Sequence, residues 1–348
     1  MRRIVQSFEE SKGMAMLKYV SRRIAISIII LVLISATVFI IFNYLPFDPA
    51  RLSCGKHCTP EIIAGNRHRL GLDVNWWVQW WRFLEGIFAG RNYGEGAALI
   101  HCGAPAFGYS FTQHECVTTL LGQALPVTVS LAIGAFIMWL VLGVTLGVIS
   151  ARFRNTWIDR LSTVFVLVGT SLPTFISGLL LLLFIVLKFN LISPLDLGTW
   201  HSPLTDPWGW FSSYFWPWLS LALIYAATYT RFTRSNVIET SSEDFIRTAR
   251  AKGVSERKVL WKHTLRPALA PILTIAGLDF AGLLGGAIIT EQIFQLPGLG
   301  RLTLQAVLQD YDLPIIVATT TLAAAFVVIA NLVVDLAYAL LDPRIRIS

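Results

Sequence analysis

Long apolar runs alternate with shorter polar stretches along this 348-residue chain. A helix needs about 20 mostly apolar residues to cross a hydrocarbon layer roughly 30 Å thick. Six segments meet this requirement, so the pattern predicts an all-α polytopic membrane protein. The predicted spans are residues 24–45, 125–149, 161–187, 215–230, 272–290 and 315–341, of which the fourth is the shortest.

Composition supports this reading. The chain is 55% hydrophobic and only 14% charged, whereas a soluble domain has roughly 25% charged residues. So little polar surface cannot cover several water-exposed cores, which argues against soluble enzyme folds. The net charge of +7 could suggest nucleic-acid binding, but the basic residues do not form one patch.

The distribution of basic residues predicts the topology. With the N-terminus in the cytoplasm, residues 1–23, 150–160, 231–271 and 342–348 lie inside and hold 20 of the 28 Lys and Arg residues. Cytoplasmic segments are expected to carry this excess, so we expect both termini in the cytoplasm. Nine of the twelve tryptophans lie in or beside the proposed outer loops, which favours the same topology. The first span has no small-residue cleavage site and is expected to be retained.

The predicted outer loop, residues 46–124, contains a tryptophan-rich segment and every cysteine. Apolar residues recur at helical spacing over 75–89, which predicts a helix along the outer membrane surface or packed inside the loop domain. Outside the cytoplasm, disulfides are the leading interpretation for Cys54, Cys58, Cys102 and Cys116, although sequence alone cannot choose among three pairings. Unpaired cysteines and a metal site at Cys54, His57, Cys58 and Cys102 are alternatives, but the spacing matches no standard zinc pattern.

The cytoplasmic stretch from Ser241 to Pro271 is too polar to span a membrane and is rich in helix-forming residues. Ser241 or Ser242 is expected to cap a first helix, Gly253 to form a turn, and a second helix to run from Ser255 to Pro267. On the first helix, Phe245, Thr248, Ala249 and Lys252 share a face that a partner protein could approach. A solvated amphipathic hairpin is the simpler alternative.

Four stretches of the sequence together resemble one family. They are SRRIAISIIILVLISATVFIIFNYLPFDPA, LGLDVNWWVQWWRFLEGIFAG, RTARAKG followed by SERKVLWKHTLRPAL, and EQIFQLPGLGRLTLQAVLQDYDLPI. In this order they resemble the dipeptide, oligopeptide and nickel permeases of ATP-binding-cassette importers, and the third resembles the cytoplasmic EAA loop of that family. The acidic residue that names this loop is replaced by Arg247, and residues 95–107 look like an insertion.

The resemblance implies a role for the chain as a permease subunit that imports peptides or related small solutes across a bacterial cytoplasmic membrane. It also implies several partners: a paralogous second permease, two ATPase subunits that bind ATP and magnesium, and an extracytoplasmic solute-binding protein. The expected organisation is a cytoplasmic tail (1–23), a first span (24–45), an outer loop (46–124), a permease core (125–341) with a coupling loop (231–271), and a cytoplasmic C-terminus (342–348). The ATPase-coupling residues that the resemblance implies are Thr248, Ala249, Ala251, Lys252, Gly253 and Leu260.

The chain is expected to hold no cofactor, because no GxxxxGK[ST] phosphate-binding motif occurs in its sequence. Two acids lie within predicted spans, Asp279 and Asp335, and such residues often mark function. They also raise two rival hypotheses, an intramembrane aspartyl protease and an ion-coupled secondary transporter. The protease is disfavoured because its motifs are incomplete, and the secondary transporter because no internal repeat is visible.

Two further segments are candidates for the transport path and for its outer end. Ser171, Pro173 and Thr174 interrupt the third span, so they could line the path with Asp279 or form a packing kink. Residues 295–300 read QLPGLG, which predicts an irregular outer segment. We expect Pro297, Gly298 and Gly300 to form an outer gate or a docking surface for the binding protein.

Overall fold

The computed structural model describes residues 2–44, 49–52, 59–69, 71–94, 99–188, 198–310 and 312–341. The chain divides into two compact units. One comprises residues 1–124 with 302–348, and the other comprises residues 125–301.

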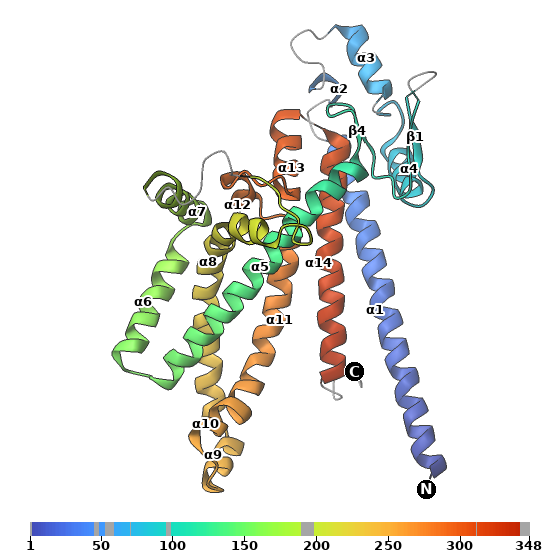
Figure 1. Cartoon of the computed structure of the whole chain (residues 1–348). Coiled ribbons are helices and arrows are strands. Elements are labelled where there is room, and N and C mark those ends of the chain that lie inside the picture. The colour runs from blue at the N-terminus through green and yellow to red at the C-terminus, as the bar shows by residue number, and fades with distance from the viewer. Residues whose placement is uncertain are drawn as a thin grey trace. The chain divides into compact units, whose positions relative to one another are not determined.

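The first unit contains two long helices and the outer loop (Figure 1). Helix α1 (Arg2–Tyr44) packs along α14 (Leu313–Leu341), so the first and last predicted spans are neighbours. Val38 of α1, Val317 of α14 and Phe83 from the outer loop form a shared apolar cluster. Because helix α1 already begins at Arg2, it also includes most of the predicted N-terminal tail.

The outer loop folds into short helices and two small hairpins. Helices α2 (Pro49–Leu52), α3 (Pro60–Arg69) and α4 (Trp76–Ala89) precede the antiparallel pair β1 (Arg91–Tyr93) and β2 (Ile100–Cys102). Strands β3 (Tyr109–Ser110) and β4 (Glu115–Cys116) form the second pair. A disulfide between Cys102 and Cys116 joins the two hairpins.

Helix α4 confirms the helix predicted over 75–89, and it has two different faces. Phe83 packs on Phe39 of α1, and the indole N–H of Trp80 donates a 3.1 Å hydrogen bond to the Ser35 hydroxyl. Trp77, Trp81 and Phe88 remain exposed. One face therefore anchors the loop to α1, while the other leaves large apolar rings available to a membrane surface.

The second unit is a bundle around helix α8 (Pro207–Ser241) (Figure 1). Most of α5 (Val117–Arg152), together with α6 (Trp157–Ser171), α7 (Thr174–Leu182) and α11 (Leu265–Leu284), belongs to it, and the π-helical turn η2 (Leu183–Lys188) follows α7. Trp139, Tyr214 and Tyr229 are fully buried in its core.

Glycines allow α5 to approach α8 closely. A Cβ atom at Gly143 would lie 2.6 Å from the Cβ of Tyr229, and one at Gly147 would lie 2.5 Å from the Cβ of Thr233. Any larger residue at either position would push the helices apart. This is the small-xxx-small packing that membrane helices use, because it brings two backbones together.

Within the residues that the structure describes, four helical segments are long and apolar enough to cross a membrane: Val20–Ile41, Val117–Arg152, Glu256–Leu284 and Leu313–Val333. The third predicted span is not one helix, because α6 and α7 meet at an angle of 101° at Leu172 and Pro173. Taken together, this bent pair is a fifth candidate. Helix α8 is long enough at 35 residues, but it is not among the candidates, so a span there remains a prediction.

The fifth predicted span is wrong at its outer end. Helix α11 stops at Leu284, and Gly286 then takes a φ of +115°, a conformation that favours glycine. The short helices α12 (Ile288–Ile293) and α13 (Leu299–Gln305) and the π-helical turn η4 (Ala306–Asp310) connect this turn toward α14. Thr290 thus belongs to α12 rather than to a spanning helix.

Candidate coupling site, outer segment and membrane path

The first part of the predicted coupling loop, residues 231–241, is the end of helix α8, and the short helix α9 (Asp244–Ala251) follows it. The expected serine cap is not formed, because Ser241 donates its hydroxyl hydrogen bond to the Val237 carbonyl and Ser242 donates to that of Glu239. Helix α8 therefore continues to Ser241, and Glu243 takes the cap position of α9 without a side-chain bond. Only Ile246 of α9 is fully buried, so this residue anchors the helix.

Gly253 forms the turn that the sequence predicts. Its φ is +76°, and nothing lies within 4 Å of where a Cβ would be, so backbone conformation rather than space favours glycine. Arg250 and Glu256 form an ion pair of 2.9 Å across this turn. The pair fixes the end of α9 against the start of α10 (Glu256–Lys258).

The second helix of the loop does not end at Pro267 as predicted. Helix α10 continues through the π-helical stretch η3 (Val259–Thr264) into α11, giving one helical segment from Glu256 to Leu284. Pro267 lies inside this continuous segment, just after the π-helical stretch, so it does not end the helix. The coupling loop is therefore built directly onto the two long helices α8 and α11.

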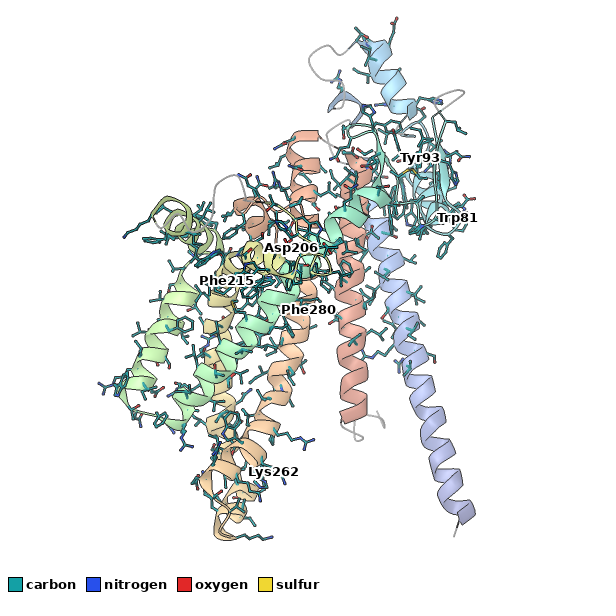
Figure 2. The ribbon with its side chains drawn as sticks, in the orientation of Figure 1. Trp81, Tyr93, Asp206, Phe215, Lys262 and Phe280 are labelled. Atoms are coloured by element: carbon teal, nitrogen blue, oxygen red, sulfur yellow. A yellow bond between two sulfur atoms is a disulfide. The ribbon has the colours of Figure 1, made fainter. Side chains whose placement is uncertain are left out.

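The six predicted coupling residues fall into two groups. Thr248, Ala251, Lys252 and Gly253 are exposed around the turn. Ala249 is half-buried, and Leu260 is half-buried against the apolar cluster of Val148, Val237, Leu265 and Ala268. Figure 2 shows Lys262 at the same end of the bundle, with Phe280 farther along α11.

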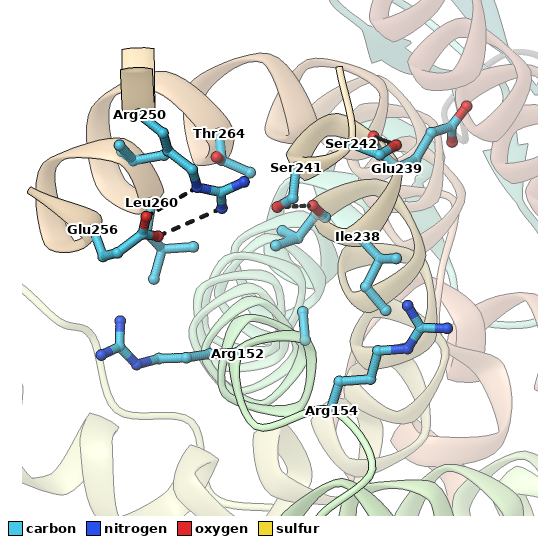
Figure 3. A pocket seen from close by; sticks show the side chains of 13 residues that line it. Arg152, Arg154, Ile238, Glu239, Ser241, Ser242, Arg250, Glu256, Leu260 and Thr264 are labelled. Atoms are coloured by element: carbon cyan, nitrogen blue, oxygen red, sulfur yellow. Dashed lines mark hydrogen bonds and ion pairs between the residues drawn. The ribbon is translucent and has the colours of Figure 1, made fainter. Parts of the chain in front are cut away.

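A groove of about 530 Å³ lies beside this turn. It is lined by the end of α5, the end of α8 and the stretch η3, and Figure 3 shows Arg152 and Arg154 across the groove from the Arg250–Glu256 pair. Sequence reasoning did not identify these four charged residues. Their signal is weak because arginines near cytoplasmic helix ends are expected from topology alone.

A buried ion pair fixes the neighbouring helix ends. Asp159 in the first turn of α6 accepts two hydrogen bonds from the Arg234 guanidinium of α8, at 2.8 and 2.9 Å. It also accepts a 2.6 Å bond from the Ser150 hydroxyl and a 3.0 Å bond from the Asn155 amide. The carboxylate thereby joins α5, α6 and α8, an arrangement that the sequence did not reveal.

The QLPGLG segment is irregular, as predicted, and it closes around a buried carboxylate. Glu291 of α12 is fully buried, and it accepts a 2.8 Å bond from the Thr128 hydroxyl and a 2.9 Å bond from the Arg301 amide. A Cβ at Gly298 would lie 2.5 Å from the Glu291 carboxyl carbon, so glycine is needed there. Gly298 and Gly300 are buried, and only Pro297 of the three predicted outer residues is exposed.

Asp279 lies in the last two turns of α11, five residues before the helix ends at Leu284. The Tyr229 hydroxyl of α8 donates a 2.6 Å hydrogen bond to one of its carboxylate oxygens. Ser171 and Pro173 are exposed at the α6–α7 break, and Thr174 is half-buried there. The helix is sharply broken here, as both the path-lining role and the packing kink would require, and within the described residues Asp279 forms no hydrogen bond to the break. The side chain of Asp335 lies outside the described part of the chain.

The outer loop has its own fixed contacts. Cys102 is in a disulfide and so cannot supply a thiolate to a metal, while Cys54, His57 and Cys58 lie outside the described residues. Asp312, just before α14, accepts bonds from the hydroxyls of Ser110 and Thr112 at 2.5 and 2.6 Å. Burial raises the pKa of the Tyr93 hydroxyl above its ordinary value, although the neighbouring Arg91 acts in the opposite direction.

Comparisons with known proteins identify the family. Residues 143–347 match the model of the binding-protein-dependent transport system inner membrane component, and residues 16–132 match that of its N-terminal part. The glutathione transport system permease proteins GsiC of Salmonella paratyphi A and Salmonella typhimurium are each 37% identical over 95% of this chain and 99% of their own length. GsiC of Escherichia coli K12 is 36% identical over the same shares.

The two family models together cover most of the sequence, and the relatives align over nearly their whole length. These matches agree with the resemblance inferred from the four sequence stretches. The chain therefore belongs to the family of binding-protein-dependent transport system inner membrane components, and it is a permease subunit of an ATP-binding-cassette importer rather than an enzyme.

Proposed function

We propose that this chain forms half of the membrane channel of an importer for small peptides, and that glutathione is the first substrate to test. The observation that carries this proposal is the similarity over nearly the whole chain to permeases named for glutathione transport. Glutathione is a tripeptide, so it fits the peptide class that the four sequence stretches indicate.

The remaining parts of the importer are separate proteins. A paralogous permease would complete the channel, two ATPase subunits would bind ATP and magnesium, and a solute-binding protein would deliver cargo from outside. The absence of a phosphate-binding motif from the sequence agrees with ATP hydrolysis by partner subunits.

The exposed turn of Thr248, Ala251, Lys252 and Gly253 is the proposed contact with an ATPase subunit. Its position between α8 and the α10–α11 segment supports this role, because a push on the turn would move two long helices as rigid bodies. Leu260 supports the turn from inside through its apolar cluster. The groove beside the turn offers the ATPase a recessed surface with charges of both signs.

The same reasoning assigns roles within and outside the membrane. Ser171, Pro173 and Thr174 line the path, because broken helix backbone is tolerated at membrane depth only against protein or water. The outer segment presents Pro297 to the binding protein, while Gly298 and Gly300 shape that segment around Glu291. Both chain termini face the cytoplasm of a bacterial cell, as the basic residues indicate.

Reconstitution tests the proposal. Proteoliposomes that contain both permeases and both ATPases, supplied with binding protein and internal ATP, should accumulate radiolabelled glutathione. Vesicles that contain only this chain should accumulate none, which separates an importer subunit from a secondary transporter. Uptake by the chain alone would refute the proposal, and uptake of other solutes but not glutathione would refute the assigned substrate.

A further inference from the structure

Asp279 is an acidic residue in a helix long and apolar enough to span a membrane, yet no basic side chain pairs with it within the described residues. Its one hydrogen bond there comes from the neutral Tyr229 hydroxyl, so its second carboxylate oxygen accepts none from the described side chains. The residue is only half-buried, so it remains accessible. Because acids within membrane spans are costly, they usually have a partner, and a missing one points to a cation from outside the chain.

Several aromatic rings belong to the helices that hold this carboxylate or pack on them. Tyr225 lies one helical turn before Tyr229 on α8, and its ring stacks on that of Trp139 with centroids 4.5 Å apart. Phe280 follows Asp279 in the chain, and its ring lies 4.9 Å from that of Phe136. Rings of this kind attract cations through their negatively charged faces, so they favour an ammonium group near the acid.

The cluster also contains a buried polar group without a partner. Trp139 is fully buried, and its indole N–H donates to no acceptor in the described part of the chain. Its ring centroid lies 6.1 Å from that of Tyr229, which holds Asp279. Because Trp139 is fully buried here, a peptide carbonyl could reach this donor only when the helices move apart during transport.

We propose that Asp279, held by the Tyr229 hydroxyl and next to the half-buried ring of Tyr225, forms a transient binding site for the ammonium group of a peptide during its passage through the membrane. This inference rests on the proposed function and deepens it, because it assigns a substrate feature that the channel itself recognises. The site would make the channel select for a free amino group in addition to any selection by the binding protein.

The test compares glutathione with glutathione acetylated on its amino group. Uptake of each is measured in the complete reconstituted importer, and each rate is divided by the occupancy of the isolated binding protein with the same peptide. In the wild-type importer this corrected preference for the free amine should be about tenfold, the scale of one charge-assisted hydrogen bond. In the variant Asp279→Asn it should fall to about onefold.

Three further variants separate recognition from structure. Asp279→Glu keeps the charge and should restore part of the preference. Tyr229→Phe removes the hydroxyl that holds Asp279 but keeps the ring and the acid, so it should reduce the preference without abolishing it. Asp206→Asn changes an acid that caps the exposed start of α8, far from Asp279 in the chain, and should leave the preference unchanged.

The outcomes are distinguishable. If the wild-type importer transports glutathione but Asp279→Asn keeps the preference, the ammonium site is refuted while the proposed function stands. If Asp279→Asn and Tyr229→Phe both reduce assembly of the two permeases to the same extent, the pair is only a helix contact and the inference is also refuted. If the wild-type importer transports neither peptide, the proposed function fails, and the inference with it.

Discussion

The hydroxyl of Thr128 in α5 donates a 2.8 Å hydrogen bond to the buried carboxylate of Glu291 in α12. The same Thr128 oxygen accepts a 2.8 Å hydrogen bond from the amide of Leu299, the first residue of α13. The other carboxylate oxygen of Glu291 accepts a 2.9 Å hydrogen bond from the Arg301 amide. Glu291, which precedes the QLPGLG segment, thus links α5 to the residues at the end of that segment.

This arrangement predicts a stability loss when the carboxylate is removed. Glu291→Ala would leave the Thr128 hydroxyl and the Arg301 amide without their acceptor, which costs about 1–3 kcal/mol for each buried donor. We expect a lower thermal unfolding midpoint for the purified importer in detergent. Gln292→Ala, at the exposed neighbouring position, is the matched control and should unfold like the wild type. Equal midpoints for both variants would contradict the role of Glu291.

The Asp159–Arg234 pair predicts a second stability effect, at the helix ends where α5, α6 and α8 meet. Arg234→Ala removes two hydrogen bonds to a buried carboxylate and should cost about 2 kcal/mol, since bonds to charged groups contribute roughly 1.5–3 kcal/mol. The measurement is denaturation of the importer in detergent. Arg231→Ala on the same helix, at an exposed position, should have little effect. The double variant with Asp159→Asn should be more stable than Arg234→Ala alone, because no buried charge is left unpaired.

The turn at Gly253 predicts a loss of coupling rather than of folding. Valine at a φ of +76° is strained by about 1–2 kcal/mol, so Gly253→Val should change the shape of the exposed turn. We expect normal membrane insertion but a severalfold lower ratio of glutathione uptake to ATP hydrolysis. Gly253→Asn is the control, because asparagine tolerates this conformation better than other non-glycine residues. A normal uptake ratio in the valine variant would rule out a coupling role for the turn.

Local patterns predicted much of this structure. The helical spacing of tryptophans in 75–89 predicted α4, the positive-φ turn at Gly253 followed from a single glycine, and Pro173 marked the break between α6 and α7. Each of these features depends on residues that are close in sequence. The length of α8 is the counter-example. The prediction followed only the 16-residue apolar stretch 215–230, whereas the helix has 35 residues and includes the flanking aromatic and polar residues.

Long-range polar contacts could not be predicted in this way. Glu291 and Thr128 are 163 residues apart, and Asp312 and Ser110 are 202 residues apart. Nothing in the sequence near Glu291 says whether the acid is exposed or buried, because its partners come from other helices. The end of α11 was missed for a related reason: residues 285–290 are apolar enough to extend a span, and only the contacts of Gly286 with Gly300 reveal the turn.

The Cys102–Cys116 disulfide is expected to stabilise the outer loop. The bond joins the two hairpins of the outer loop across a sequence separation of 14, and a loop of this size contributes roughly 3 kcal/mol in the chain-entropy account. Cys102→Ser should therefore lower the unfolding midpoint of the importer.

The same disulfide allows the topology to be tested. In a variant with Cys54→Ser and Cys58→Ser, a membrane-impermeant maleimide should label intact spheroplasts only after treatment with an impermeant reductant. A disulfide persists in an oxidising compartment, so this result would place residues 99–124 outside the cytoplasm. Labelling that requires permeabilised membranes would invert the proposed topology and would place the Gly253 turn on the side without ATP.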